Sequence, residues 1–212
     1  MIALINKKKN KYPTFALILG FILLITLFLP FAMPVESGVV SKEALSFVWI
    51  WGLCYGQGEF FFLLIPMGLT FYLIFLAILI LMIFILIRGF ELKKNRLSLV
   101  KFGEQVFIFS FLIILGSVVL MVSIEYSFLF FSNIPIMGLS KADFWSYHIP
   151  GFGYIGVFFV SYLLLNVSLA PMGYGRSNFF YFALVLFIIV TLIIVLFSID
   201  ILFFPIIRLI LG

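Results

Sequence analysis

The chain has 212 residues, of which 66% are hydrophobic and 10% are charged, with a formal net charge of +5 and a mean hydropathy of +1.36. A water-soluble protein averages about 45–50% apolar and about 25% charged residues. A globule with so few polar residues could not cover its surface with polar groups, so the composition excludes soluble, disordered and fibrous proteins and indicates an integral membrane protein.

Five apolar runs are long enough to cross a bilayer. A helix needs about 20 apolar residues to cross a hydrocarbon core about 30 Å thick, and within that core a helix satisfies its own backbone hydrogen bonds. The predicted fold is therefore an all-α, polytopic transmembrane helical bundle, forming one membrane domain over residues 1–212. Its five predicted spans are residues 14–33, 60–87, 106–131, 152–170 and 179–199.

The first span follows the basic stretch Lys7–Lys11. We expect a retained signal anchor, because the apolar core is about 20 residues long rather than 7–15. In the outer loop that follows, residues 34–58, Ser41 predicts the N-cap of a short helix that runs to Trp51 and lies on the membrane surface. Three glycines between Gly52 and Gly58 predict turns beyond it.

The second and third spans, 28 and 26 residues long, are each about 10 Å longer than the hydrocarbon core. Tilt can absorb such an excess, or both helices can project outward as neighbours joined by the inner connector, residues 88–105. In the second case their aromatic ends need a cover. We predict a small aromatic outer cap formed by the two outer loops, 34–58 and 132–151, with a kink in the second helix at Pro66.

Three glycines mark the start of the fourth span: Gly151, Gly153 and Gly156. They predict either the close approach of another helix or a flexible entry from loop to helix. The inner connector at residues 171–178 is predicted to be a tight Gly/Pro turn. The apolar tail after Asp200 is too short to cross again, and we expect it to lie along the outer surface or against the cap.

The basic residues predict the orientation. Ten of the thirteen cations fall on one side if the N-terminus is cytoplasmic, and only Lys42, Lys141 and Arg208 fall outside. Cations are retained on the cytoplasmic side, so the N-terminus is predicted inside and the C-terminus outside. This bias accounts for the net charge together with attraction to anionic lipids, and no nucleic-acid partner is expected. Abundant Phe, Ile, Lys and Asn favour a prokaryotic plasma membrane.

The outer side carries the candidate functional residues. One histidine with two carboxylates can coordinate a divalent metal or form an acid–base pair, and Glu125, Asp143 and His148 are the candidates for a metal site. The alternative is a set of interfacial caps and surface charges, and no catalytic residue or other cofactor is predicted. The predicted interaction cap consists of Trp49, Trp51, Cys54, Glu59, Trp145 and Asp200.

The first outer loop contains Trp51-Gly52-Leu53-Cys54, follows a short inner N-terminus and precedes an elongated third helix. In these features the chain resembles the claudin-type tetraspan family. That family's pattern has a second cysteine in the same loop and four spans, whereas this chain has one cysteine and five predicted spans. No residue role is transferred from the family.

Three functions are compatible with the sequence. The first is a non-catalytic membrane subunit or interaction protein that presents its aromatic, acidic cap to other membrane proteins or to copies of itself. The second is a small transporter or permeation component, which needs polar faces on three or more helices; the sequence has one, around Ser123 and Ser127 on the third helix. The third is a membrane-embedded enzyme or metal site at the outer surface.

Overall fold

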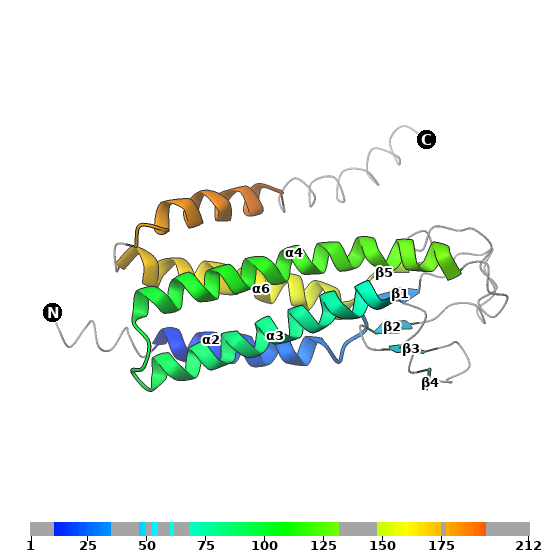
Figure 1. Ribbon diagram of the computed structural model, residues 1–212, viewed down its shortest axis with the longest axis horizontal. Helices are drawn as coiled ribbons and strands as arrows, with labels where there is room; N and C mark the ends of the chain where they lie inside the picture. Colours follow the sequence, from blue (N-terminus) through cyan, green and yellow to red (C-terminus); the bar gives the residue numbers. More distant parts are fainter. Residues whose placement is uncertain are drawn as a thin grey trace, which may run out of the picture.

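The computed structural model describes residues 11–34, 47–49, 52–54, 60–61, 68–131, 148–174 and 177–193. Helices α2 (Lys11–Thr26), α3 (Gly68–Lys93), α4 (Leu99–Phe131) and α6 (Phe152–Tyr174) lie side by side along the long axis (Figure 1). A further apolar helix, Phe180–Ile193, packs outside them and is called the last helix below. The predicted helical class is confirmed.

The four long helices form a closed ring. α2 packs on α3, α3 on α4, α4 on α6 and α6 on α2, and the α4–α6 contact is the most extensive. Side chains buried in the centre of the ring include Leu23, Met82, Phe102 and Leu164. A second cluster lies between α4, α6 and the last helix, and its buried members are Phe107, Ile114, Leu165, Met172 and Ala183.

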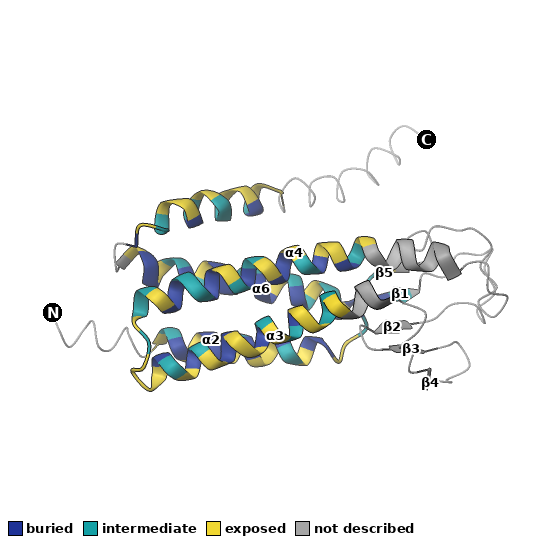
Figure 2. Cartoon of the chain, in the orientation of Figure 1, coloured by how far each residue is buried: buried dark blue, intermediate teal, exposed yellow. Residues whose placement is uncertain are grey.

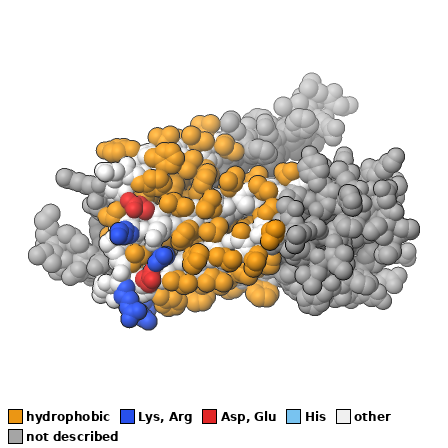
Figure 3. Space-filling view, viewed as in Figure 1, with side chains coloured by type: hydrophobic (Ala, Val, Ile, Leu, Met, Phe, Trp, Pro, Cys, Tyr) orange, Lys and Arg blue, Asp and Glu red, His pale blue; other side chains and the backbone are white. Residues whose placement is uncertain are grey.

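Three helices within the described residues are long and apolar enough to cross a membrane. These candidate spans are Leu73–Lys93, Leu99–Val122 and Phe152–Gly173, and α2 and the last helix are shorter apolar helices. Their outward faces are exposed (Figure 2) and covered with hydrophobic side chains (Figure 3). Because such a surface is stable against hydrocarbon and not against water, the chain is a multi-pass integral membrane protein whose helices contact lipid.

Several predicted boundaries need correction. The second helix begins at Gly68 rather than at residue 60, and Phe60–Phe61 is a strand. The predicted inner connector at residues 88–105 is largely helical, because α3 continues to Lys93 and α4 begins at Leu99. Cations in the last turn of a helix stabilise its C-terminus. Their long side chains can also reach from the apolar region to the polar headgroups, so the helix can continue past the first charged residue. The first charged residue is therefore a poor marker of a helix end.

The turn between α3 and α4 is closed by two local motifs. Asn95 has a left-handed backbone (φ 57°), and its N–H donates to Leu92 O while Arg96 N–H donates to Glu91 O. This pair of bonds is a Schellman motif, in which Asn is one of the few residues to tolerate the left-handed conformation. Ser98 then caps α4 by accepting the Lys101 N–H at 3.3 Å.

A five-stranded antiparallel sheet lies at the opposite end of the bundle (Figure 1). Its order is β4-β3-β2-β1-β5, from β1 (Ala32–Pro34), β2 (Phe47–Trp49), β3 (Gly52–Cys54), β4 (Phe60–Phe61) and β5 (His148–Pro150). The predicted helix between Ser41 and Trp51 is therefore wrong over residues 47–49, which pair with residues 52–54 instead. Aromatic and β-branched residues favour strands, and that preference prevails here over the local capping signal.

Candidate functional site

The sheet joins segments that the sequence assigned to the two outer loops and to the ends of the first two spans. β1 directly follows α2, and β5 directly precedes α6. The two strands pair in the register Ala32 with Pro150, Met33 with Ile149 and Pro34 with His148. One side of the sheet is thereby fixed to the ends of two helices of the bundle.

Close glycine contacts strengthen this junction. A Cβ atom built on Gly153 would lie 2.5 Å from Leu29 O, and one built on Gly156 would lie 2.5 Å from Thr26 Cγ2. The N–H of Gly151 donates to Phe31 O at 2.8 Å, and the N–H of Gly153 donates to Pro30 O at 2.8 Å. The close approach of another helix is confirmed at Gly156, which meets α2, whereas Gly151 and Gly153 approach the segment between α2 and β1.

The two edges of the sheet differ in their backbone donors. In an antiparallel pair, hydrogen-bonded and non-hydrogen-bonded residue pairs alternate. The bond from Gly151 to Phe31 makes theirs a hydrogen-bonded pair, so the register makes Ala32–Pro150 and Pro34–His148 non-hydrogen-bonded pairs. A residue in such a pair directs its N–H away from the partner strand, and Pro150 has none, so the outward edge of β5 is blunted.

β4 forms the opposite edge. Its residues pair with β3 on one side, Phe61 with Leu53 and Phe60 with Cys54. Its other side is unpaired among the described strands. Neither Phe60 nor Phe61 is a proline, so this edge keeps backbone groups that can pair with a further strand.

The structure places four of the predicted functional residues on described backbone. Trp49 lies in β2, Cys54 in β3 and His148 in β5, and Glu125 lies in the last third of α4. The first three thus belong to one sheet. The remaining predicted residues lie outside the described part of the chain: Trp51, Glu59, Asp143, Trp145 and Asp200. The metal site at Glu125, Asp143 and His148 therefore stays a prediction.

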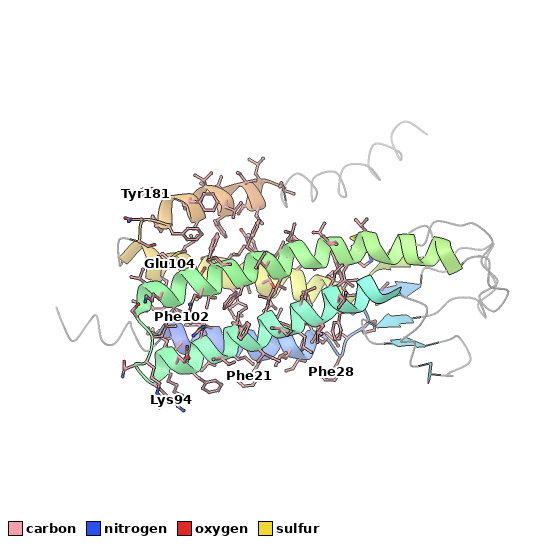
Figure 4. The ribbon with its side chains drawn as sticks, in the orientation of Figure 1. Phe21, Phe28, Lys94, Phe102, Glu104 and Tyr181 are labelled. Atoms are coloured by element: carbon pink, nitrogen blue, oxygen red, sulfur yellow. The ribbon has the colours of Figure 1, made fainter. Side chains whose placement is uncertain are left out.

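Charged side chains gather at the end of the bundle opposite the sheet (Figure 3). Arg88 and Glu91 form an ion pair at 2.5 Å near the end of α3. Next to the last helix, the Ser177 hydroxyl donates to the carboxylate of Glu104, a residue of α4 (Figure 4). Ser177 Oγ also accepts the Phe179 N–H at 3.1 Å, so Ser177 caps the last helix and ties it to α4.

The contact between Ser177 and Glu104, called the clamp below, was not predicted from the sequence. Ser177 precedes an apolar helical run and so carries a readable N-cap signal, but its partner Glu104 lies 73 residues earlier in the chain. A second tie is visible only in the structure. Tyr162 OH and Thr191 Oγ1 are 3.0 Å apart, and the ring of Tyr162 stacks on Phe187 at 5.3 Å.

The interface between α3 and α4 contains two buried polar side chains, and an apolar groove lies beside it. The rings of Phe84 and Phe109 are in contact at 5.8 Å, and one turn nearer the basic end stand Arg88 and Gln105, whose buried Nε and Oε1 atoms have no hydrogen-bond partner among the described residues. Toward the sheet, a groove of about 530 Å³ is lined by Ile, Leu, Val, Ala and Gly residues and includes Gly116.

Comparisons with family models, curated proteins and solved structures give no match for this chain.

Proposed function

We propose that the chain is a membrane interaction protein that binds a partner protein at the β4 edge of its sheet, on the outer side of the membrane. The edge at Phe60–Phe61, which is unpaired among the described strands, carries the proposal, because an unpaired strand edge is a template to which a partner can add a strand. The blunted edge at Pro150 supports a single direction of growth for the sheet.

The junction with the bundle supports this role. β1 and β5 are fixed to α2 and α6 by strand register and by the bonds of Gly151 and Gly153. A binding edge held on rigid elements loses little conformational entropy when a partner binds. The partner is another membrane protein or a second copy of this chain, because the sheet is attached to the ends of two helices of a membrane bundle.

We propose five crossings, with the N-terminus cytoplasmic and the C-terminus outside, in the plasma membrane of a prokaryote. The distribution of charge supports this orientation. Arg88, Lys93, Lys94, Arg96 and Lys101 all belong to the end away from the sheet, and the cytoplasmic side is the one that retains cations. The sheet then faces the exterior.

A cross-linking experiment tests the proposed edge. A photoreactive amino acid is placed at Phe61 in β4 or at Ile149 in β5, and cells that express each variant are irradiated. Both positions lie in edge strands of one sheet, so Ile149 is the matched control. We expect a protein adduct at Phe61 and none at Ile149, because Pro150 removes one of the outward donors of β5, whereas neither residue of β4 is a proline.

A second variant identifies the contact as strand pairing. The register makes Leu53–Phe61 a hydrogen-bonded pair and Cys54–Phe60 a non-hydrogen-bonded pair, so the outward N–H of β4 belongs to Phe60. Phe60→Pro removes that N–H and is expected to abolish the adduct formed from a photoreactive residue at Phe61, whereas Phe60→Leu keeps it. Mass spectrometry of the adduct distinguishes a second copy of the chain from a different protein. Adducts at Ile149 but not at Phe61, or adducts that survive Phe60→Pro, would contradict the proposal.

A further inference from the structure

The turn between α3 and α4 exposes a group of cations at the end of the bundle. Lys93, Lys94, Arg96 and Lys101 are all exposed, and Lys94 points away from the helices (Figure 4). These four residues are called the basic hairpin below. We propose that the basic hairpin binds the phosphate groups of anionic phospholipids in the adjacent leaflet.

The basic hairpin presents its charges from a defined turn. The left-handed residue Asn95 and the bond from Arg96 N–H to Glu91 O, 2.8 Å long, end α3, and the cap from Ser98 begins α4 two residues later. The backbone that carries the four cations is therefore held by hydrogen bonds on both sides of the turn. Less conformational entropy is lost when a headgroup binds such a turn than when it binds a disordered basic segment.

The nearby acids are occupied elsewhere. Glu91 pairs with Arg88, and Glu104 accepts the hydroxyl of Ser177. Within the described part of the chain, no ion pair involves a cation of the basic hairpin. These four positive charges are thus available to an anion from outside the protein.

Lys101 shows that local helix stability does not account for the whole cluster. It lies in the first turn of α4, which has no acidic residue. A cation is unfavourable there, because the N-terminus of a helix carries a partial positive charge. An anion bound beside Lys101 offsets that repulsion, whereas Lys93 is already favourably placed in the last turn of α3.

The position of the hairpin favours a lipid over a free phosphate ion. The two spans that it joins, Leu73–Lys93 and Leu99–Val122, end and begin at the hairpin, where the headgroup region starts. Deeper along α3, Ile87 and Phe90 are 41% and 44% exposed and face the acyl chains. A phospholipid therefore contacts the cations with its phosphate and the apolar face of the same helix with its chains.

Lipid titration of the purified full chain tests the proposal. The chain in mild detergent is titrated with phosphatidylglycerol or with phosphatidylcholine of the same acyl chains, and bound lipid is counted by native mass spectrometry. We expect preferential binding of phosphatidylglycerol. The variant K94Q/R96Q/K101Q, which keeps Lys93 to support α3, is expected to weaken that binding about 100-fold, because each of the three cations near an anionic surface contributes about fivefold.

A matched variant controls for net charge. K42Q/K141Q/R208Q removes the same three charges from the predicted outer segments, and we expect it to bind phosphatidylglycerol like the unmodified chain. Equal loss in both variants, or equal affinity for the two lipids, would overturn the proposal. Displacement of the lipid by soluble glycerol 3-phosphate would also overturn it, because the ligand would then be a free phosphate.

The unmodified chain gives an independent reading if the triple variant does not fold. Binding through exposed charges weakens as the salt concentration rises, so the affinity for phosphatidylglycerol is expected to fall steeply with added sodium chloride. Affinity that does not change with salt would contradict binding by the basic hairpin.

Discussion

Gly153 lies where the start of α6 meets the segment between α2 and β1, and the nearest atoms to an added Cβ would be backbone atoms: Leu29 O at 2.5 Å and Pro30 O at 3.0 Å. Backbone cannot rotate away as a side chain can. The sequence alone did not decide the role of this glycine, because glycine is favoured both where another segment approaches closely and where a loop enters a helix flexibly. Only the packing of α2 distinguishes the two.

Gly153→Ala is therefore expected to lower the free energy of unfolding by about 1–3 kcal/mol, the usual range for overpacking a buried contact. Gly116→Ala is the matched control, because its added Cβ would meet the side chain of Ile78 at 3.1 Å and that side chain can shift. Thermal unfolding in detergent compares the two variants. Equal stability of both would show that the α2–α6 contact is looser than described.

Ser177 joins two functions in one hydroxyl group, since it caps the last helix and donates to Glu104. Ser177→Ala is expected to lower the free energy of unfolding by about 1–2 kcal/mol through loss of the cap and of a bond to a charged acceptor. Ser168→Ala is the control, because the Ser168 hydroxyl donates only to Leu165 O in its own helix. A smaller effect for Ser177→Ala than for Ser168→Ala would refute the clamp.

At the scale of elements, the helices were more readable than the strands. A helix as long as α4 is encoded by its own apolar run, and α4 is helical throughout the predicted third span, residues 106–131. The strands span two or three residues each, and β1 finds its partner β5 more than 100 residues later. Such pairing depends on contacts that no local pattern contains, so the sheet could not be predicted.

The register of β1 and β5 can be tested by disulfide formation. In a Cys54→Ser background, Met33→Cys with Ile149→Cys is expected to form a cross-link on mild oxidation, because directly opposed strand residues have a Cα separation within the disulfide range. Met33→Cys with His148→Cys is expected to remain reduced, because successive strand residues face opposite sides of a sheet. Gel mobility distinguishes the products, and efficient cross-linking of the second pair alone would mean a register shifted by one residue.

At the scale of the whole molecule, composition alone identified a helical membrane protein, and the three candidate spans agree with it. The ring of α2, α3, α4 and α6, with the last helix outside it, required the contacts themselves. Only part of the candidate site could be predicted from the sequence. Trp49, Cys54 and His148 belong to one sheet, whereas the edge at Phe60–Phe61 was hidden because the sequence analysis assigned those residues to a span.

In the proposed orientation, the sheet and the basic hairpin lie on opposite sides of the membrane. Labelling of single cysteines with a membrane-impermeant maleimide measures this directly, using Ile149→Cys and Lys94→Cys, each in a Cys54→Ser background. We predict that intact cells label the cysteine at position 149 and label position 94 only after permeabilisation. Labelling of position 94 in intact cells, or protection of position 149, would contradict the orientation and the proposed binding edge together.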